Sequence, residues 1–184
     1  MTFAVTPQIV TGVYGLRCVT YFPHRDGGEL DARTARFLSS VGLPTSDVFT
    51  SRMDVDDPYG PDVDASTIGG RFDRYGLHCP AESRSWWPLG YLFTSLLALD
   101  PASGTIYAFP EGALGYVKLH RDVESLVFAL VEFRKVENDH ANGLDPEELA
   151  AGFRDTVEAF DPTPFEVEDS QWNQSLEELE HGIW

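Results

Sequence analysis

The clearest pattern along this chain is a helical spacing of apolar residues that follows Asp122. Val123, Leu126, Val127 and Leu130 recur at positions i, i+3, i+4 and i+7, which places them on one face of a helix. Asp122 directly precedes this stripe, and a short side chain with an oxygen acceptor is typical of a helix N-cap. The spacing predicts a helix that begins after Asp122 and lies on a sheet.

Two further helices are predicted downstream. One begins near Leu144, because Asp145 can cap a helix and Pro146 suits its first turn. The expected buried residues of this helix are Leu149, Phe153, Val157 and Phe160, and those of the last helix are Trp172, Leu176, Leu179 and Ile183.

Upstream of these helices, another helix is expected over Asp31 to Val41. Asp31 is a suitable N-cap, and Gly42 followed by Pro44 is a typical helix stop. Glycine can adopt the left-handed conformation that ends a helix, and proline cannot continue one.

The middle of the chain has the features of β-structure. Tyr91 to Leu99 is expected to form a strand, Asp100 to Gly104 a turn, and Thr105 to Phe109 the returning strand of a hairpin. Residues from Gly115 to His120 alternate between apolar and polar side chains, which predicts a third strand. Together these segments predict a meander of three antiparallel strands.

Two shorter strands are expected before the meander, over Asp47 to Arg52 and over Ile68 to Phe72. The order of helix, strands and helices indicates an α+β fold, with a mainly antiparallel twisted sheet flanked by an N-terminal helix and C-terminal helices. A length of 184 residues fits one domain over residues 1–184.

The net charge of the chain excludes some classes of binding partner. The chain has 30 acidic and 13 basic residues, a formal net charge of −17, which argues against binding to nucleic acid or to an anionic membrane. Fourteen of the acids lie between residues 137 and 184, where Arg154 is the only lysine or arginine. These acids are either ordinary solvated helix faces or a surface that attracts a positively charged partner.

Several features indicate a cytoplasmic protein. The N-terminus has no basic residue before Arg17 and no unbroken apolar run, so it lacks the layout of a secretory signal. The uncharged stretch from Ser85 to Leu99 covers 15 residues and is too short to span a bilayer. Cys18 and Cys79 are too few for a disulfide framework, which favours two reduced thiols.

The chain contains none of the common catalytic motifs with the residue spacing that they require. The chain has no G-x-S-x-G elbow, no phosphate-binding glycine loop and no H-E-x-x-H zinc motif. His78 and Cys79 are adjacent, which makes joint ligation of one zinc ion awkward. The sequence therefore indicates neither an enzyme nor a bound metal or cofactor. A small hydrolase, as an alternative, would need a pocket where His120 or His78 meets nearby carboxylates.

The densest group of carboxylates lies in the loop from Asp54 to Asp64. Counted from Asp54, glycine falls seventh and Ala65 twelfth, so the loop does not match an EF-hand calcium site. It is either a solvated turn or a docking loop for a basic partner. Two adjacent tryptophans follow, and they are either core residues or anchors for a partner. The candidate partner-binding residues are Asp54, Asp56, Asp57, Tyr59, Asp62, Asp64, Trp86 and Trp87.

Five segments of the chain resemble the SUKH superfamily, most closely its fourth branch, from bacterial polymorphic toxin systems. They are FLSSVGLP at 37–44, LGYLF at 89–93, LALDPASGTIYAF at 97–109, VESLVF at 123–128 and WxxxLEELxxGIW at 172–184. The region of resemblance is residues 31–184, which leaves residues 1–30 as an N-terminal extension.

The resemblance implies an α+β fold and a cytoplasmic immunity protein that neutralises a toxin, often a nuclease or a nucleic-acid deaminase. It carries over no catalytic residues and no defined interface. We therefore expect stoichiometric binding to a cognate toxin with a basic surface. A regulatory scaffold or adaptor, a role filled by other members of the superfamily, is the main alternative.

Overall fold

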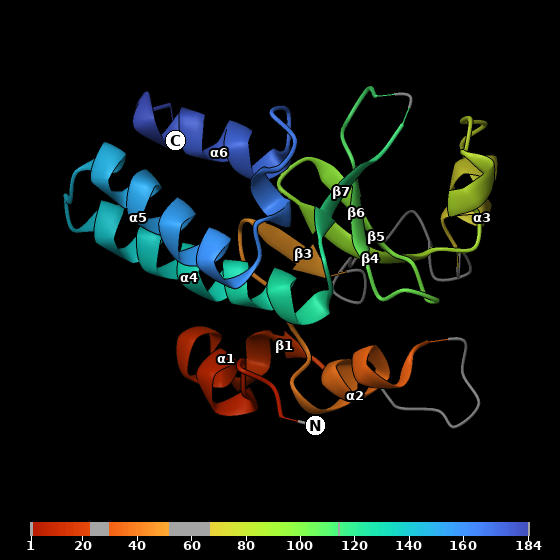
Figure 1. Cartoon of the computed structure of the whole chain (residues 1–184), viewed down its shortest axis with the longest axis horizontal. Coiled ribbons are helices and arrows are strands. Elements are labelled where there is room, and N and C mark those ends of the chain that lie inside the picture. The colour runs from red at the N-terminus through yellow and green to blue at the C-terminus, as the bar shows by residue number, and fades with distance from the viewer. Residues whose placement is uncertain (1, 23–29, 52–66, 114, 184) are drawn as a thin grey trace.

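The computed structural model describes residues 2–22, 30–51, 67–113 and 115–183, and Figure 1 shows their arrangement. A five-stranded sheet and a separate two-stranded sheet are accompanied by helices that precede and follow the strands, which confirms the expected α+β class. The helices are α1 (Pro7–Tyr14), α2 (Ala32–Ser40), α3 (Ile68–Arg74), α4 (Val123–Ala141), α5 (Pro146–Phe160) and α6 (Gln171–Glu180). The strands are β1 (Val19–Thr20), β2 (Leu43–Pro44), β3 (Phe49–Ser51), β4 (Trp87–Leu92), β5 (Ser95–Leu99), β6 (Ile106–Phe109) and β7 (Val117–His120).

The five-stranded sheet is an antiparallel meander with the strand order β3-β4-β5-β6-β7. The hairpin expected around the turn at Asp100 to Gly104 is formed by β5 and β6, and β7 is the expected third strand. The strand expected over Asp47 to Arg52 is β3, which is shorter than predicted and pairs with β4.

The prediction of a single strand over Tyr91 to Leu99 is wrong, because the chain reverses within it. Phe93 and Thr94 form a two-residue turn between β4 and β5. Phe93 has a φ of 49°, in the left-handed region that a tight hairpin turn requires. Its ring meets Phe133 and Trp172 edge-on, at 5.9 and 6.2 Å between centroids. These contacts come from α4 and α6, and no local turn signal marks the site.

The prediction of a strand over Ile68 to Phe72 is also wrong, because these residues lie in helix α3. The Thr67 hydroxyl accepts a hydrogen bond from the backbone N–H of Gly70 and caps the helix. Ile68 is fully buried in a cluster that includes Trp86. A β-branched residue followed by two glycines has low helix propensity, so the cap and the buried contact determine the local structure.

Helices α4, α5 and α6 lie together on one side of the five-stranded sheet, which we call its inner face (Figure 1). All four residues of the stripe that predicts α4 are buried, and Asp122 and Asp145 cap α4 and α5 as expected. The prediction that Ile183 docks on the core is wrong, since α6 ends at Glu180 and Ile183 is 76% exposed. The other expected core residues of α5 and α6 are buried (Phe153, Val157, Trp172, Leu176 and Leu179) or half-buried (Leu149 and Phe160).

The N-terminal part of the chain is held to α4 by a buried carboxylate. Glu124 accepts hydrogen bonds from the backbone N–H groups of Ala4 and Val5. It also forms an ion pair with Arg33 of α2, the helix that begins after the expected cap, Asp31. Glu124 thus links the N-terminal segment, α2 and α4.

Both faces of the five-stranded sheet are covered at its centre. In β5, Leu97 and Leu99 pack into the inner core, whereas Leu96 and Ala98 belong to a second cluster on the opposite, outer face. Helix α3 lies on the outer face, away from α4, α5 and α6 (Figure 1). The outer face therefore has an apolar cluster of its own.

Candidate functional site

Packed aromatic side chains cover part of the outer face of the sheet. The Trp86 ring stacks on Tyr107, with centroids 4.1 Å apart and an interplanar angle of 16°, and meets Tyr116 at 4.8 Å. The Tyr116 hydroxyl donates a 2.8 Å hydrogen bond to the Glu82 carboxylate. Burial, together with this hydrogen bond, raises the pKa of Tyr116 to about 12, so the phenol stays protonated as a donor.

The two tryptophans predicted as partner anchors lie on different sides of the structure. Trp86 is only 6% exposed and belongs to the outer aromatic cluster. Trp87, the first residue of β4, is half-buried and packs against the inner core. The structure therefore does not bring them together into one exposed patch, and their part in partner binding stays a prediction. The other candidates, Asp54, Asp56, Asp57, Tyr59, Asp62 and Asp64, lie outside the described residues.

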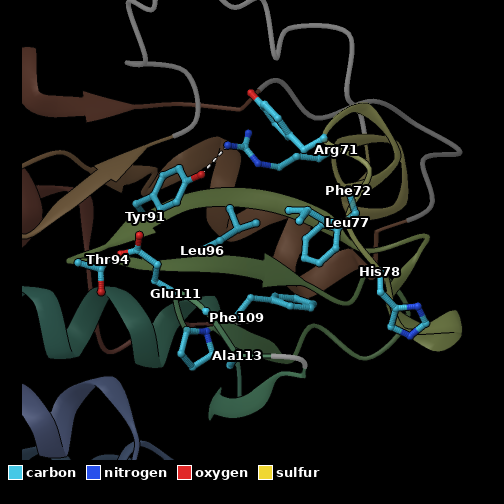
Figure 2. A pocket seen from close by; sticks show the side chains of 13 residues that line it. Arg71, Phe72, Leu77, His78, Tyr91, Thr94, Leu96, Phe109, Glu111 and Ala113 are labelled. Carbon is cyan, nitrogen blue, oxygen red and sulfur yellow. Dashed lines mark hydrogen bonds between the residues drawn. The ribbon is translucent and has the colours of Figure 1, made fainter.

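A groove of about 700 Å³ opens on the outer face, and we call it the outer groove (Figure 2). Its lining comes from α3 and the residues after it, from β4 and β5, and from the end of β6 and the residues that follow. Most of the lining is aromatic or aliphatic, including Phe72, Tyr75, Leu77, Tyr91, Leu96 and Phe109, and the polar members are Arg71, His78, Thr94 and Glu111.

Helix α3 and the residues after it form one wall of the outer groove. The Arg71 guanidinium donates a hydrogen bond to the Tyr91 hydroxyl (Figure 2). The same group lies 5.4 Å from the centre of the Tyr91 ring and 5.9 Å from that of Tyr75. Tyr75 and Leu77 are 57% and 58% exposed. Large exposed apolar side chains beside a packed aromatic floor are typical of a binding surface.

The outer groove has the features of a binding surface, because its lining is mostly apolar. Figure 2 shows two of its polar residues, His78 and Glu111, at opposite ends of the groove. Sequence reasoning missed this groove because it assigned Ile68 to Phe72 to a strand, which hides the wall that α3 provides.

His120 also meets a carboxylate, but in the interior of the protein. The indole N–H of Trp172 donates to its Nε2 at 2.9 Å, so Nδ1 carries the ring proton and faces Ser125 Oγ at 2.8 Å. The Ser125 hydroxyl donates in turn to Asp161. The hydrogen bonds therefore run in one direction, from Trp172 through His120 and Ser125 to Asp161.

The protonation states in this network follow from burial and hydrogen bonding. Burial lowers the pKa of His120 to about 3, and the neighbouring charge of Asp161 opposes this only in part. Burial raises the pKa of Asp161, but hydrogen bonds from Arg121, Ser125 and Thr163 together lower it below its ordinary value. Because Ser125 donates to a carboxylate and His120 is fully buried, the network does not form the substrate pocket that a hydrolase needs.

A second candidate surface lies on α5, α6 and the residues that join them. Arg154, half-buried against the Phe165 ring, is the only lysine or arginine after residue 137. In Figure 1, α5 and α6 lie at the opposite end of the molecule from α3. We call this surface the acidic helix surface, and its exposed carboxylates are Asp145, Glu147, Glu148, Asp155, Glu158, Glu166, Glu168, Asp169, Glu177, Glu178 and Glu180.

In the described part of the chain, no three or more histidine, cysteine, aspartate or glutamate side chains are grouped to hold a metal ion. None of the described helices is long and apolar enough to cross a bilayer. Cys18 is exposed and Cys79 is buried, and both are free.

A comparison with protein-family models finds a match to the model described as SUKH-4 immunity protein, over residues 5–178. The matched range begins within the first 30 residues and so includes most of the segment that the sequence resemblance leaves out. No curated protein and no solved structure matches this chain.

Proposed function

This chain belongs to the SUKH-4 immunity protein family, and on that premise we propose that it binds a cognate toxin in a one-to-one complex and blocks the toxin's active surface. Membership of the family implies neutralisation of a toxin, and immunity proteins are generally non-catalytic. The proposal adds that the toxin is a nuclease or a nucleic-acid deaminase with a basic surface, and that the complex forms in the cytoplasm.

The observation that carries this proposal is the exposure of eleven carboxylates on the acidic helix surface, beside a single half-buried arginine. An enzyme that acts on nucleic acid needs a basic groove to hold phosphates. A protein that presents carboxylates can occupy such a groove in the place of the phosphates. Inhibition of this kind is steric and electrostatic, and it requires no chemical step.

Two surfaces are candidates for the contact. One is the loop from Asp54 to Asp64, as proposed from the sequence, with Trp86 and Trp87 as separate candidate anchors because they lie on different sides of the structure. The other is the acidic helix surface. Charges at the contact raise the association rate, whereas charges more than about 8–10 Å away are screened at physiological salt. Association kinetics therefore distinguish the two surfaces.

The test is the binding of two charge-reversed variants to a catalytically inactivated form of the protein encoded by the neighbouring open reading frame. One variant carries Asp56→Lys and Asp57→Lys, and the other carries Glu177→Lys and Glu178→Lys. At low salt we expect the variant altered at the contact surface to associate about tenfold more slowly, with the difference shrinking as salt is added.

Neutral variants provide the matched control, because Glu177→Gln with Glu178→Gln removes charge without reversing it and should slow association less than the lysine pair. Association rates that are the same for wild type and both reversed variants would contradict acidic-surface docking. Failure of the wild-type protein to bind this toxin or to inhibit its active form would contradict the proposed function itself.

A further inference from the structure

We propose that the outer groove is a contact between two copies of this chain, which form a two-fold symmetric dimer. The inference goes beyond the proposed function and does not depend on it. It assigns an interaction surface to the side of the molecule that carries α3, and it leaves the acidic helix surface of each copy free to meet a toxin.

The distribution of charge along the chain favours a second copy as the occupant of the groove. Residues 67–118 include every described residue of the groove lining, and they have as many basic as acidic side chains. These are Arg71, Arg74, Arg84 and Lys118 against Asp73, Glu82, Asp100 and Glu111. Fourteen acids and one arginine lie instead between residues 137 and 184. A second copy therefore meets no excess of like charge in the segment that forms the groove.

Contact through the groove also keeps the acidic helix surfaces of the two copies apart. In Figure 1, α5 and α6 lie at the opposite end of the molecule from α3. The two acidic helix surfaces would thus lie at the far ends of the dimer, and charges farther apart than about 8 Å are largely screened at physiological salt. Contact between the acidic helix surfaces themselves would instead bring exposed carboxylates of both copies together.

The outer face has both a projecting and a receiving part, which a contact of one patch with its own copy requires. Tyr75 and Leu77, which we call the rim pair, are 57% and 58% exposed, whereas Leu96 and Phe109 of the lining are 8% and 7% exposed. A volume of about 700 Å³ is in the range of pockets that bind ligands larger than one side chain. The rim pair of each copy can therefore enter the groove of the other, and one contact removes both pairs from water.

The wall that carries the rim pair is already fixed in the single chain. The backbone N–H of Gly69 donates to the carbonyl of Arg84 at 2.9 Å, and a Cβ added at Gly69 would meet the same oxygen at 2.8 Å. The Phe72 ring packs edge-on against Phe109, with centroids 5.4 Å apart. Because the groove is preformed, little conformational entropy is lost when a second copy binds.

A basic segment of the toxin is the other occupant to compare. The described lining contains one arginine, Arg71, and one glutamate, Glu111, so it has no excess of negative charge that would attract such a segment. The rest of the described lining is mostly apolar. An apolar surface without net charge suits a copy of itself better than it suits a basic partner.

Sedimentation equilibrium of the purified full-length protein, with no toxin present, tests the dimer. We expect a concentration-dependent equilibrium between one chain of 20.5 kDa and a species of twice that mass. Tyr75→Ala/Leu77→Ala should raise the dissociation constant of the dimer at least about tenfold, because it truncates the anchors of the contact. Tyr75→Phe/Leu77→Met is the matched control, since it keeps the apolar area, and it should dimerise within about twofold of wild type.

Leu77→Lys supplies an independent readout, because it would bury an unpaired charge in the contact and should abolish the dimer. Leu16→Lys, the same change at a leucine that is 69% exposed and does not line the groove, should dimerise as wild type does. Residue 77 is itself largely exposed, so urea unfolding should show that the variant is folded.

A wild-type protein that stays monomeric, or a dimer that persists unchanged in Leu77→Lys, would overturn the groove as the contact between copies. A monomeric wild type whose toxin binding is lost in Tyr75→Ala/Leu77→Ala would assign the groove to the toxin, which overturns the dimer and leaves the proposed function standing. Since sedimentation is measured without toxin, its outcome does not depend on the proposed function.

Discussion

Acidification should destabilise this protein through His120 before most of its carboxylates are protonated. His120 is fully buried, and burial lowers its pKa to about 3 from an ordinary value of 6.5. A histidine whose pKa is lowered by folding binds fewer protons in the folded state than in the unfolded state, so acid favours unfolding. The stability that depends on neutral His120 is present above pH 6.5 and is lost as the pH falls from 6.5 toward 3.

The size of this effect between pH 7 and pH 5 depends almost entirely on the unfolded state. A pKa near 3 leaves the folded imidazole neutral throughout this interval. Protonation of an unfolded histidine with a pKa of 6.5 over the same interval lowers the free energy of unfolding by about 2 kcal/mol. Below about pH 4 the loss grows, because the pKa of Asp161 is also lowered by folding. The interval from pH 7 to pH 5 therefore isolates the contribution of His120.

Urea unfolding at pH 7, 6 and 5 measures this loss. In His120→Gln the part of the pH dependence that arises from His120, about 2 kcal/mol, should disappear, even if the variant is less stable overall. His181→Gln, at an exposed position just after α6, should keep the wild-type dependence. The reasoning is refuted if both histidine variants show the same pH dependence, or if NMR shows the His120 ring titrating near pH 6.5 in the folded protein.

Two further substitutions, Ser125→Ala and Gly90→Ala, test contacts in the interior, and Gly76→Ala is the control for the second. Ser125→Ala removes the hydroxyl that donates to Asp161, so it should lower the free energy of unfolding at pH 7 by about 1–3 kcal/mol and raise the pKa of Asp161. Urea unfolding over a range of pH should therefore show the acid-induced loss of stability beginning at a higher pH than in wild type. An unchanged onset would contradict this role of Ser125. Gly90→Ala would place a Cβ 2.2 Å from the carbonyl oxygen of Thr50, at a φ of 153°, so we expect a loss of about 3 kcal/mol or more. Gly76→Ala, at a φ of 65° with open space around it, should lower the free energy of unfolding by about 1 kcal/mol in the same assay. Equal losses of stability in Gly90→Ala and Gly76→Ala would contradict the close approach of β3 to β4.

The parts of the fold that the sequence predicts well are those in which local signals and burial agree. Asp31, Asp122 and Asp145 cap α2, α4 and α5, and the stripe from Val123 to Leu130 is buried as its spacing requires. A cap and an apolar stripe are properties of neighbouring residues, so they can be identified without knowing what the helix packs against.

The incorrect predictions arise where a distant contact determines the local conformation. The turn at Phe93 depends on rings from α4 and α6, and α3 forms although its first residues have low helix propensity. Ile183 has the right spacing for a buried helical position, but α6 ends before it. In each case the spacing is compatible with the prediction, and only the tertiary contacts rule it out.

The sequence by itself determined the α+β class, the starts of α2, α4 and α5, the excess of acidic residues and the resemblance to an immunity family. Each of these depends on composition or on residues close together in the chain. Only the tertiary structure placed Trp86 beneath Tyr107 and Tyr116, separated it from Trp87, and assembled the outer groove. A strand directs successive side chains to opposite faces, which separates Trp86 from Trp87. The outer groove is lined by segments that are far apart in the sequence. The spacing of residues along the chain cannot show which of these segments lie together.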